Sequence, residues 1–275
     1  MITRCRPLLG TLVEITVPEG SEDAVGPAFA AMAEIHARMS FHDPASDLAA
    51  LRTAPPGEVV MVDCETVWVL RMAVALHEAT EGLFDVAVGR ALVRGGFLPR
   101  EGIMHLNRFT GTTADIEIID DRNVRCHRRT LIDLGGIAKG HAVDRAVETL
   151  VAAGASAGLV NAGGDLRTFG ERDWQVQLRD ADEAIRHVVT VPDCAIASSA
   201  NLHNRRQVKG RPHGPHIGWN GTPVLTDQRV TVIAERCIIA DAMTKVAMVN
   251  ADLADEILEA HRGYVLRAAL LAGAA

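Results

Sequence analysis

Asp133-Leu-Gly-Gly-Ile-Ala-Lys-Gly140 is a glycine-rich segment that leads directly into a helix predicted over Gly140–Ala153. Glycine pairs let the backbone approach a ligand closely, and the free N–H groups at a helix start favour anions. Lys139 adds a positive charge that could neutralise a pyrophosphate. The segment has neither the Gly-Lys-Ser/Thr of a Walker motif nor the spacing G-x-G-x-x-G. It therefore indicates either a phosphate site of another kind or a tight turn that needs positive φ.

A second glycine turn and a later helix carry the other candidate groups. Asn161-Ala-Gly-Gly-Asp165 follows a predicted strand and leaves the same two interpretations open. The helix predicted over 238–249 carries Asp241, Thr244 and Lys245, which share one face at positions i, i+3 and i+4. The carboxylate and the hydroxyl could bind a hard cation such as Mg²⁺, whereas the alternative is an exposed Asp–Lys pair worth about 0.3–0.5 kcal/mol. Because the rest of this helix is almost entirely apolar, a charged group within it needs partners, which favours the functional interpretation.

Helices and strands follow one another in mixed order along the chain. This order, rather than strict βαβ alternation, predicts an α+β fold of mixed sheets with flanking helices. The proline- and glycine-rich segment 209–223 has the composition of a surface loop rather than a linker, so one compact domain over residues 1–275 is predicted. Besides the two helices above, helices are predicted over 22–39, 65–80 and 253–261, and strands over 10–17, 116–118, 124–126, 159–161, 174–178, 188–191, 195–198 and 230–233.

Composition excludes several classes of protein. The net charge of −7 and only ten aromatic residues argue against a nucleic-acid partner. Five scattered cysteines without CxxC spacing argue against a disulfide framework or a thiolate zinc site. No apolar stretch is long enough to span a membrane, and no signal peptide is recognised. We therefore expect a cytoplasmic protein, or an exported one if a leader has been removed from this sequence.

Six segments, in this order, resemble the FAD:protein FMN transferases, the ApbE family. The fourth is the most recognisable string of the family and is complete here, and the sixth opens the helix that would bind the metal. The segments are Leu9-Gly10-Thr11, Ser40–Leu48, Thr80–Gly89, Asp133–Asp144, Val160–Asp165 and Ala240-Asp241-Ala242.

The resemblance implies a T-fold-like architecture and a reaction. Family members use Mg²⁺ to cleave the pyrophosphate of FAD and attach FMN through a phosphoester to a Thr or Ser of an acceptor flavoprotein, releasing AMP. By resemblance, His216 and Asp241 are the catalytic candidates, with His216 a candidate general base, and the metal ligands are the carbonyl of Ala138, Asp241 and Thr244. The residues implied around FAD are Leu9, Phe41, Leu83, Phe84, Asp85, Ile137, Lys139, Asp165, His216 and Ile217.

Three departures from the family pattern leave alternatives open. After His216-Ile217 the chain reads Gly-Trp-Asn-Gly221 instead of the usual Asp-Pro string, and Ser198-Ser199-Ala200-Asn201 lacks the usual acidic residue. Lys245 stands where the family has threonine, and its ammonium either points away or takes the place of the metal. The alternatives are an FAD pyrophosphatase, in which water replaces the acceptor hydroxyl, and a flavin-binding protein that has lost its chemistry. AMP release and covalent flavin on an acceptor distinguish the three.

Overall fold

The computed structural model describes residues 1–180 and 183–267, and it contains sheets flanked by helices, which confirms the predicted α+β class. No helix among these residues is both long and apolar enough to cross a membrane. The helices are α1 (Glu22–Met39), α2 (Asp47–Thr53), α3 (Cys64–Ala79), α4 (Gly89–Arg94), α5 (Ala138–Ala152), α6 (Cys237–Ala247) and α7 (Ala251–Glu259), with 3₁₀ turns η1 (Leu106–Arg108), η2 (Thr113–Asp115) and η3 (Trp219–Gly221). The strands are β1 (Ile2–Leu8), β2 (Thr11–Val17), β3 (Val59–Met61), β4 (Ile116–Ile118), β5 (Asn123–Cys126), β6 (Gly158–Ala162), β7 (Asp165–Phe169), β8 (Trp174–Arg179), β9 (Ile185–Val191), β10 (Ala195–Ser199), β11 (Arg206–Val208), β12 (Arg211–His213), β13 (Val230–Ala234) and β14 (Tyr264–Val265).

Contacts within the chain fall into two compact units. Unit 1 comprises residues 1–36, 139–202 and 226–275, and unit 2 comprises residues 37–138 and 203–225. Neither unit is one continuous stretch that a single linker would separate. The expectation of one domain over the whole chain therefore stays a prediction.

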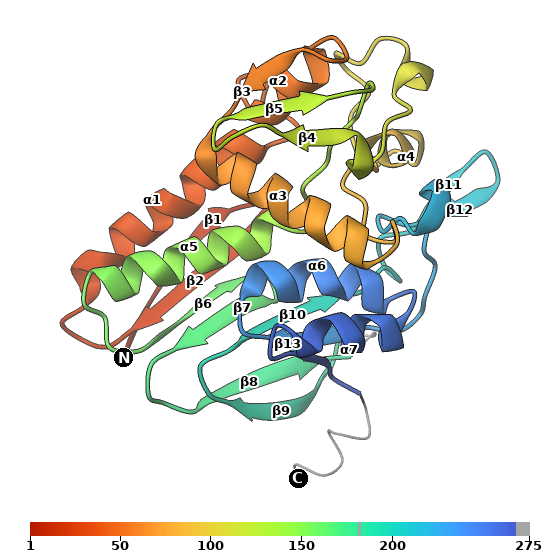
Figure 1. The fold of residues 1–275 in the computed structure, drawn as a ribbon. Coiled ribbons are helices and arrows are strands. Elements are labelled where there is room, and N and C mark those ends of the chain that lie inside the picture. Colours follow the sequence, from red (N-terminus) through yellow and green to blue (C-terminus); the bar gives the residue numbers. More distant parts are fainter. Residues whose placement is uncertain (181–182, 268–275) are drawn as a thin grey trace. The chain divides into compact units, whose positions relative to one another are not determined.

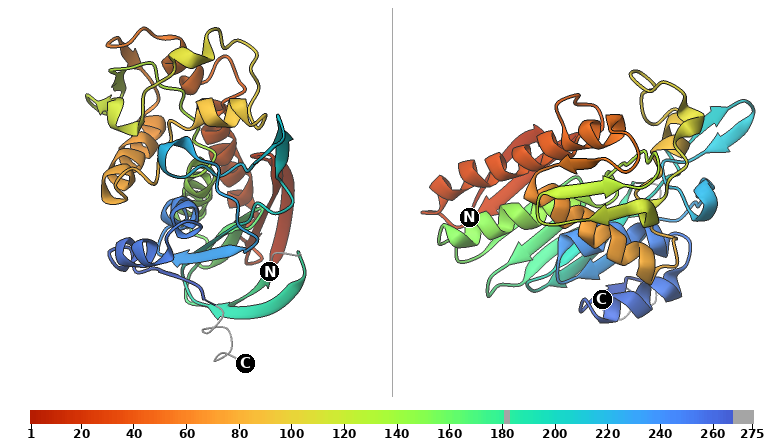
Figure 2. Two further views of the ribbon diagram at one scale, coloured as in Figure 1. Left: turned by 90° about the vertical axis from the view of Figure 1, so that its right-hand side faces the viewer. Right: turned by 45° about the horizontal axis from the view of Figure 1, so that its top comes forward.

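Unit 1 is built on a seven-stranded sheet with the order β1-β2-β6-β7-β10-β13-β14. Its inner strands show the alternation expected of strands packed on a core: Val13, Ile15 and Val17 of β2 are fully buried, whereas the residues between them are not. Helices α5, α6 and α7 lie on one face of this sheet (Figure 1 and Figure 2). On this side of the sheet, Lys139 of α5 pairs with Asp165 of β7, and Gly140 contacts Asp241 of α6.

The β8–β9 hairpin packs against part of the opposite face of the sheet (Figure 1). Trp174, Val176 and Leu178 alternate along β8 and pack against apolar residues of the sheet strands, among them Leu166 and Ile196. Burying a side chain of this size contributes about 1.5–3 kcal/mol. The sheet is therefore packed on both of its faces, by this hairpin on one side and by helices on the other.

Unit 2 combines a small antiparallel sheet, ordered β3-β5-β4, with helices α2, α3 and α4. Its buried cluster is aromatic and aliphatic and includes Phe41, Phe109 and Leu131. The segment 209–223 belongs to this unit and is mostly loop, as predicted, although its first residues pair in the β11–β12 hairpin.

The sequence patterns miss helices α2 and α4 and strands β1, β3, β7, β11, β12 and β14, of which β1, β7 and β14 belong to the seven-stranded sheet. β1 is an edge strand whose central residues are exposed and include Pro7, so it shows no apolar alternation. β7 carries Asp165 and Arg167, two charges that a buried strand excludes unless both are paired. Both are paired with residues of α5, which no local pattern reveals.

Candidate functional site

The glycine-rich segment ends where α5 begins, at Ala138. The backbone N–H groups of Ile137 and Ala138 donate to the carbonyl of Leu134, which winds the chain into the first helical turn. Gly135 and Gly136 do not adopt left-handed φ, so these two glycines are not explained by a turn that needs positive φ. The predicted helix is confirmed as α5, and the glycines precede its N-terminus.

Gly140 sets how closely α5 and α6 approach. A Cβ at this position would lie 2.3 Å from the Cys237 carbonyl oxygen and 2.8 Å from Cβ of Asp241. Its N–H donates to Oδ2 of Asp241 over 3.1 Å. The absence of a side chain at Gly140 therefore allows the carboxylate of α6 to sit against the start of α5.

Replacing Gly140 with alanine is expected to lower the free energy of unfolding by about 1–3 kcal/mol, because the added methyl group overpacks a fixed contact. The two helices must separate to admit it, so the Gly140–Asp241 hydrogen bond should lengthen as well. Chemical denaturation of the purified variant measures the first effect. A stability equal to that of the natural chain would show that the helices separate freely and that their contact positions nothing.

Asp144 of α5 fixes the N-terminus of α6. Its fully buried carboxylate accepts the backbone N–H groups of Cys237 (2.9 Å) and Ile238 (3.0 Å), while the N-cap residue Arg236 provides no side-chain cap of its own. Nη1 of Arg167 lies 2.9 Å from the same carboxylate. Asp144 thus satisfies two helix N–H groups that would otherwise be buried without partners.

Four charged groups form a cluster in unit 1, which we call the Lys–Asp cluster: Lys139, Asp165, Asp241 and Lys245. Lys139 is ion-paired with Asp165, and Nζ of Lys245 lies 2.5 Å from Oδ1 of Asp241. The side chains of the two aspartates are 2% and 0% exposed, whereas those of Lys139 and Lys245 are 29% and 18% exposed. Two buried carboxylates therefore pair with two lysines whose side chains are partly exposed.

The pKa values in this cluster follow from burial and mutual charge. Burial raises the pKa of the Asp165 carboxyl, as does the neighbouring Asp241, against the opposing effect of Lys139 and Lys245. For Asp241, burial acts in the same direction, but the two ammonium groups outweigh it and lower the pKa. Burial lowers the pKa of Lys139, but the two carboxylates raise it to a net value above the ordinary one. The cluster thus keeps Lys139 charged at neutral pH.

Two of the three predicted metal ligands, Asp241 and Thr244, are in contact with the ammonium of Lys245. Nζ of Lys245 lies 3.0 Å from Oγ1 of Thr244 as well as 2.5 Å from Oδ1 of Asp241. The third predicted ligand, the carbonyl of Ala138, belongs to the first residue of α5. Among the described residues, no three His, Cys, Asp or Glu side chains converge as a metal site. With Lys245 in this position, the oxygens of Asp241 and Thr244 do not fit Mg²⁺, which requires oxygens at about 2.0–2.1 Å in an octahedron.

The second glycine turn joins β6 to β7 as a two-residue hairpin loop. Gly163 (φ +67°) and Gly164 (φ +101°) are both left-handed, which a loop of this kind requires. Here the interpretation as a tight turn is confirmed, and Asp165 begins the strand that follows. A Cβ on Gly163 would lie 2.3 Å from Oγ1 of Thr11, so the turn that contains Leu9 lies beside it.

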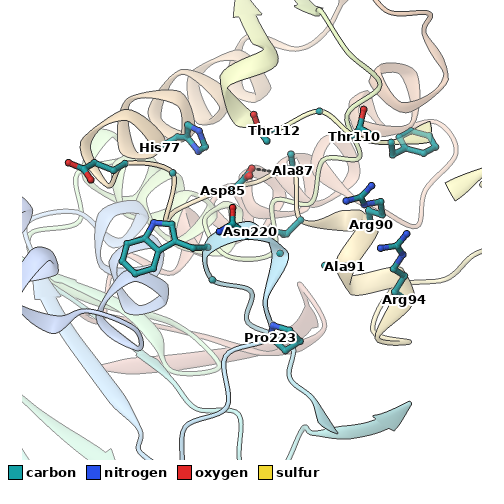
Figure 3. A pocket seen from close by; sticks show the side chains of 18 of the residues that line it. His77, Asp85, Ala87, Arg90, Ala91, Arg94, Thr110, Thr112, Asn220 and Pro223 are labelled. Atoms are coloured by element: carbon teal, nitrogen blue, oxygen red, sulfur yellow. Dashed lines mark hydrogen bonds between the residues drawn. The ribbon is translucent and has the colours of Figure 1, made fainter. Parts of the chain in front are cut away.

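Unit 2 contains a pocket of about 610 Å³, lined in part by residues of the family-like segment Thr80–Gly89, among them Asp85. Figure 3 shows that His77 comes from α3, Arg90 and Arg94 come from α4, and Asn220 comes from the loop that carries η3. Trp219 also lines the pocket and is 41% exposed. In the part of the chain that the structure describes, the Arg90 guanidinium has no hydrogen bond or ion pair. An aromatic ring beside cationic groups suits an aromatic ring system that carries phosphate.

The residues implied around FAD in unit 2 lie in different surroundings. Phe41, Leu83 and Phe84 are buried, at 5%, 3% and 4% exposure. Asp85 lines the pocket, although its Oδ1 accepts hydrogen bonds from Thr113 and, as Figure 3 shows, from the N–H of Ala87. Of these four, only Asp85 presents a polar group to the pocket. Their roles stay predictions.

His216 and Ile217 lead into the pocket loop. The carbonyl of His216 accepts the N–H of Val224, and Ile217 forms an isolated bridge with Pro223, which closes the loop between them. His216 is half-buried and does not itself line the pocket. Its predicted role as a base stays a prediction.

Sequence reasoning did not identify Asp144, Arg90 or Arg94 as functional residues. Asp144 closes the fourth family-like segment, but its part in capping α6 depends on a contact 93 residues along the chain. Arg90 and Arg94 are spaced i, i+4 and so share a helix face, a signal that the sequence does carry.

A model described as the ApbE family matches residues 9–266 of this chain. A relative from Vibrio cholerae named FAD:protein FMN transferase is 26% identical over 233 residues, which cover 78% of this chain and 70% of the relative. One of the same name from Rhodobacter capsulatus is 30% identical over 256 residues, covering 86% of this chain and 49% of that protein.

Solved structures give the same result at the level of the fold. The crystal structure of an ApbE protein from Thermotoga maritima superposes with a TM-score of 0.80 at 30% sequence identity. It covers 91% of this chain, which in turn covers 87% of that chain.

Proposed function

The chain belongs to the ApbE family, and from this premise we propose that it transfers FMN from FAD to a hydroxyl group of an acceptor flavoprotein. The acceptor is a Thr or Ser side chain. Its oxygen forms a new bond to the phosphorus of the FMN moiety, the bond from that phosphorus to the bridging oxygen breaks, and AMP leaves with that oxygen. Relatives that carry this activity in their name support the proposal.

The observation that carries the proposal is the Lys–Asp cluster at the start of α5. A transferring phosphoryl group gains most from positioning and from fixed positive charge. Lys139 and Lys245 supply two ammonium groups that are fixed by buried carboxylates, and Lys139 lies in the first turn of a helix. The positive end of the helix dipole acts in the same direction.

The pocket of unit 2 is our candidate for an aromatic portion of FAD. Its volume of about 610 Å³ lies within the range of small-molecule sites. Trp219 offers a face for stacking, and Arg90 and Arg94 offer guanidinium groups to phosphate oxygens. Their contribution would be affinity and orientation.

The acceptor hydroxyl must lose a proton when its oxygen attacks. We assign this step to His216, because an imidazole is the side chain most often used as a general base. The proton passes from the hydroxyl to a ring nitrogen of His216 and then to solvent.

Magnesium enters this proposal only as an alternative. The ammonium of Lys245 is bound to the oxygens of Asp241 and Thr244 that a metal would need. We therefore derive no step through a metal and assign neutralisation of the phosphate charge to the two lysines. A requirement for Mg²⁺ would show instead that Lys245 moves aside.

Intact-mass spectrometry tests the proposed reaction. The full chain is incubated with FAD and a flavoprotein domain that carries an acceptor threonine, with Mg²⁺ in one sample and EDTA in the other. A mass gain of one FMN on the acceptor, with an equal amount of AMP, is the expected result. The acceptor with that threonine changed to alanine is the control and should gain no mass.

Two other outcomes of this experiment would each point to a different function. AMP without the mass gain would replace the proposal with FAD pyrophosphatase activity. Bound FAD with neither product would make the chain a flavin-binding protein without chemistry.

Replacing Arg90 with alanine is expected to raise the KM for FAD about tenfold, which corresponds to about 1.4 kcal/mol for one charge-assisted contact. The turnover number should change little, because the pocket is assigned to binding. Arg71→Ala is the matched control, since this arginine of α3 forms only a surface pair with Asp121 over 3.1 Å. Equal KM values for both variants would remove the pocket from the FAD site.

A further inference from the structure

Lysine is used sparingly in this protein. The sequence contains 25 arginines but only three lysines: Lys139, Lys209 and Lys245. Two of these three belong to the Lys–Asp cluster. Lysine differs from arginine in carrying its charge as a compact ammonium with three donors instead of a planar fork. The cluster is therefore the main place where the chain uses a small, point-like cation.

Nζ of Lys245 is surrounded by oxygen atoms. It lies 2.5 Å from Oδ1 of Asp241, 3.1 Å from the carbonyl oxygen of Asp241, 3.0 Å from Oγ1 of Thr244 and 3.2 Å from Oγ of Ser199. A carboxylate, a carbonyl and two hydroxyls are also the ligand types that a hard cation takes from a protein. The ammonium thus occupies the centre of an oxygen cage.

Hydrogen bonds from β10 and from α5 hold the oxygen atoms of this cage in place. Oγ of Ser199, in β10, lies 2.8 Å from Oγ1 of Thr244, which in turn donates to the carbonyl of Asp241 over 2.7 Å. The second carboxylate oxygen of Asp241 accepts the N–H of Gly140. Every oxygen around Nζ belongs to a fully buried or nearly buried residue, so the cage is rigid.

The formal charge of the cluster is balanced. Asp165 and Asp241 carry two negative charges, and Lys139 and Lys245 carry two positive charges. A divalent cation at Asp241 would bring the net charge of the cluster to about +2. The cation would also lie close to two ammonium groups, which carry charge of the same sign. Such repulsion disfavours binding strongly where water is excluded.

We propose that the Lys245 ammonium is the built-in cation of this site, so that the chain binds the phosphates of FAD without a divalent metal at Asp241. The use of FAD rests on the proposed function, whereas the exclusion of the metal does not. The side chain of Lys245 is 18% exposed, and in this proposal its ammonium contacts a phosphate oxygen of FAD while Asp241 holds it in place.

Binding of Mn²⁺, used as a paramagnetic substitute for Mg²⁺, tests the exclusion directly. Electron paramagnetic resonance measures free Mn²⁺ in titrations of the natural chain, Lys245→Thr and a control, Lys209→Asn. Threonine removes the ammonium and leaves a hydroxyl that can ligate. The control removes a lysine of unit 2 that is not part of the cluster, and asparagine tolerates the left-handed φ (+50°) of this position.

The natural chain and Lys209→Asn should bind no Mn²⁺ up to about 1 mM, and Lys245→Thr should bind one ion at least about tenfold more tightly. Stoichiometric binding by the natural chain with an affinity within threefold of that of Lys245→Thr would overturn the proposal. Absence of binding by a folded Lys245→Thr would also overturn it, because the cage would then not be a cation site.

A second measurement needs no variant. The dissociation constant of FAD for the natural chain, read from flavin fluorescence, should agree within about twofold in EDTA and in Mg²⁺. A loss of tenfold or more in EDTA would overturn the proposal even if Lys245→Thr failed to fold. Failure to bind FAD in either buffer would refute the proposed function instead, and the Mn²⁺ titration would still report on the cage.

Discussion

Replacement of Asp144 by alanine is expected to lower the free energy of unfolding by about 3–5 kcal/mol, because it breaks a buried charge network and leaves its partners uncompensated. The carboxylate is fully buried and accepts from Nη1 of Arg167 and from the N–H groups of Cys237 and Ile238. Without it, the first turn of α6 loses its cap and the guanidinium of Arg167 loses its partner. Urea denaturation followed by circular dichroism measures the change.

Glu148→Ala is the matched control for this prediction. Glu148 lies one turn later on α5 and pairs with Nη2 of Arg236 over 2.7 Å, but its side chain is 38% exposed. A pair of this kind at the surface contributes at most about 1 kcal/mol. If the two variants lost equal stability, burial of Asp144 would not be the cause, and its capping of α6 would be of little consequence.

The difference between these two acids illustrates what local sequence pattern can reveal. The helical period predicts α5 and α6, and the family-like segments single out Lys139, Asp165 and Asp241. The patterns contain no information that Asp144 caps α6, because its partners there lie 93 and 94 residues away in the sequence. They become neighbours only when α5 and α6 pack together in the fold. The same holds for Gly140, whose importance depends on a carbonyl of another helix.

Strand β7 was missed for a related reason. Prediction of a buried strand relies on apolar residues, and β7 begins with Asp165 and contains Arg167. Both charges are tolerated because α5 supplies Lys139 and Asp144 as partners. The charged residues of β7 break the rule that buried strands are apolar, and they lie at the candidate site. Functional sites are commonly the places where such local rules fail.

The sequence indicates the unit 2 pocket only in part, because its residues come from separate segments: the resemblance implies Asp85, but it does not imply Arg90 or Arg94. Arg90 and Arg94 belong to a six-residue helix that was not predicted, and Trp219 lies in the loop segment. Phe41, Leu83 and Phe84, which the resemblance implies around FAD, are buried, and their role there stays a prediction. A motif names residues, but which of them line a cavity depends on how separate segments pack, and the local pattern does not contain that information.

Replacing Asp241 by asparagine is expected to reduce the rate of FMN transfer by about 10²–10³-fold, the size of effect seen when a preorganised electrostatic group is removed. The amide can still accept the N–H of Gly140, so contact between α5 and α6 should persist. It no longer balances Lys245, 2.5 Å away, or Lys139. Lys245 then loses its carboxylate partner and its fixed position, and Lys139 keeps only Asp165. Since positioning acts on the transferring group, the turnover number should fall more than the KM rises.

The variant must be shown to be folded for this result to count. Removing one partner of a buried pair costs about 3 kcal/mol, which thermal unfolding would detect without loss of the native circular dichroism spectrum. Asp252→Asn is the control, because Asp252 is 89% exposed and pairs with Arg267 only at the surface, so activity and stability should stay unchanged. Turnover by Asp241→Asn within threefold of the natural chain would remove the Lys–Asp cluster from the reaction. The pocket of unit 2 would then be the remaining candidate for the chemistry, since a cluster that tolerates loss of its central carboxylate cannot be what stabilises a transferring phosphoryl group.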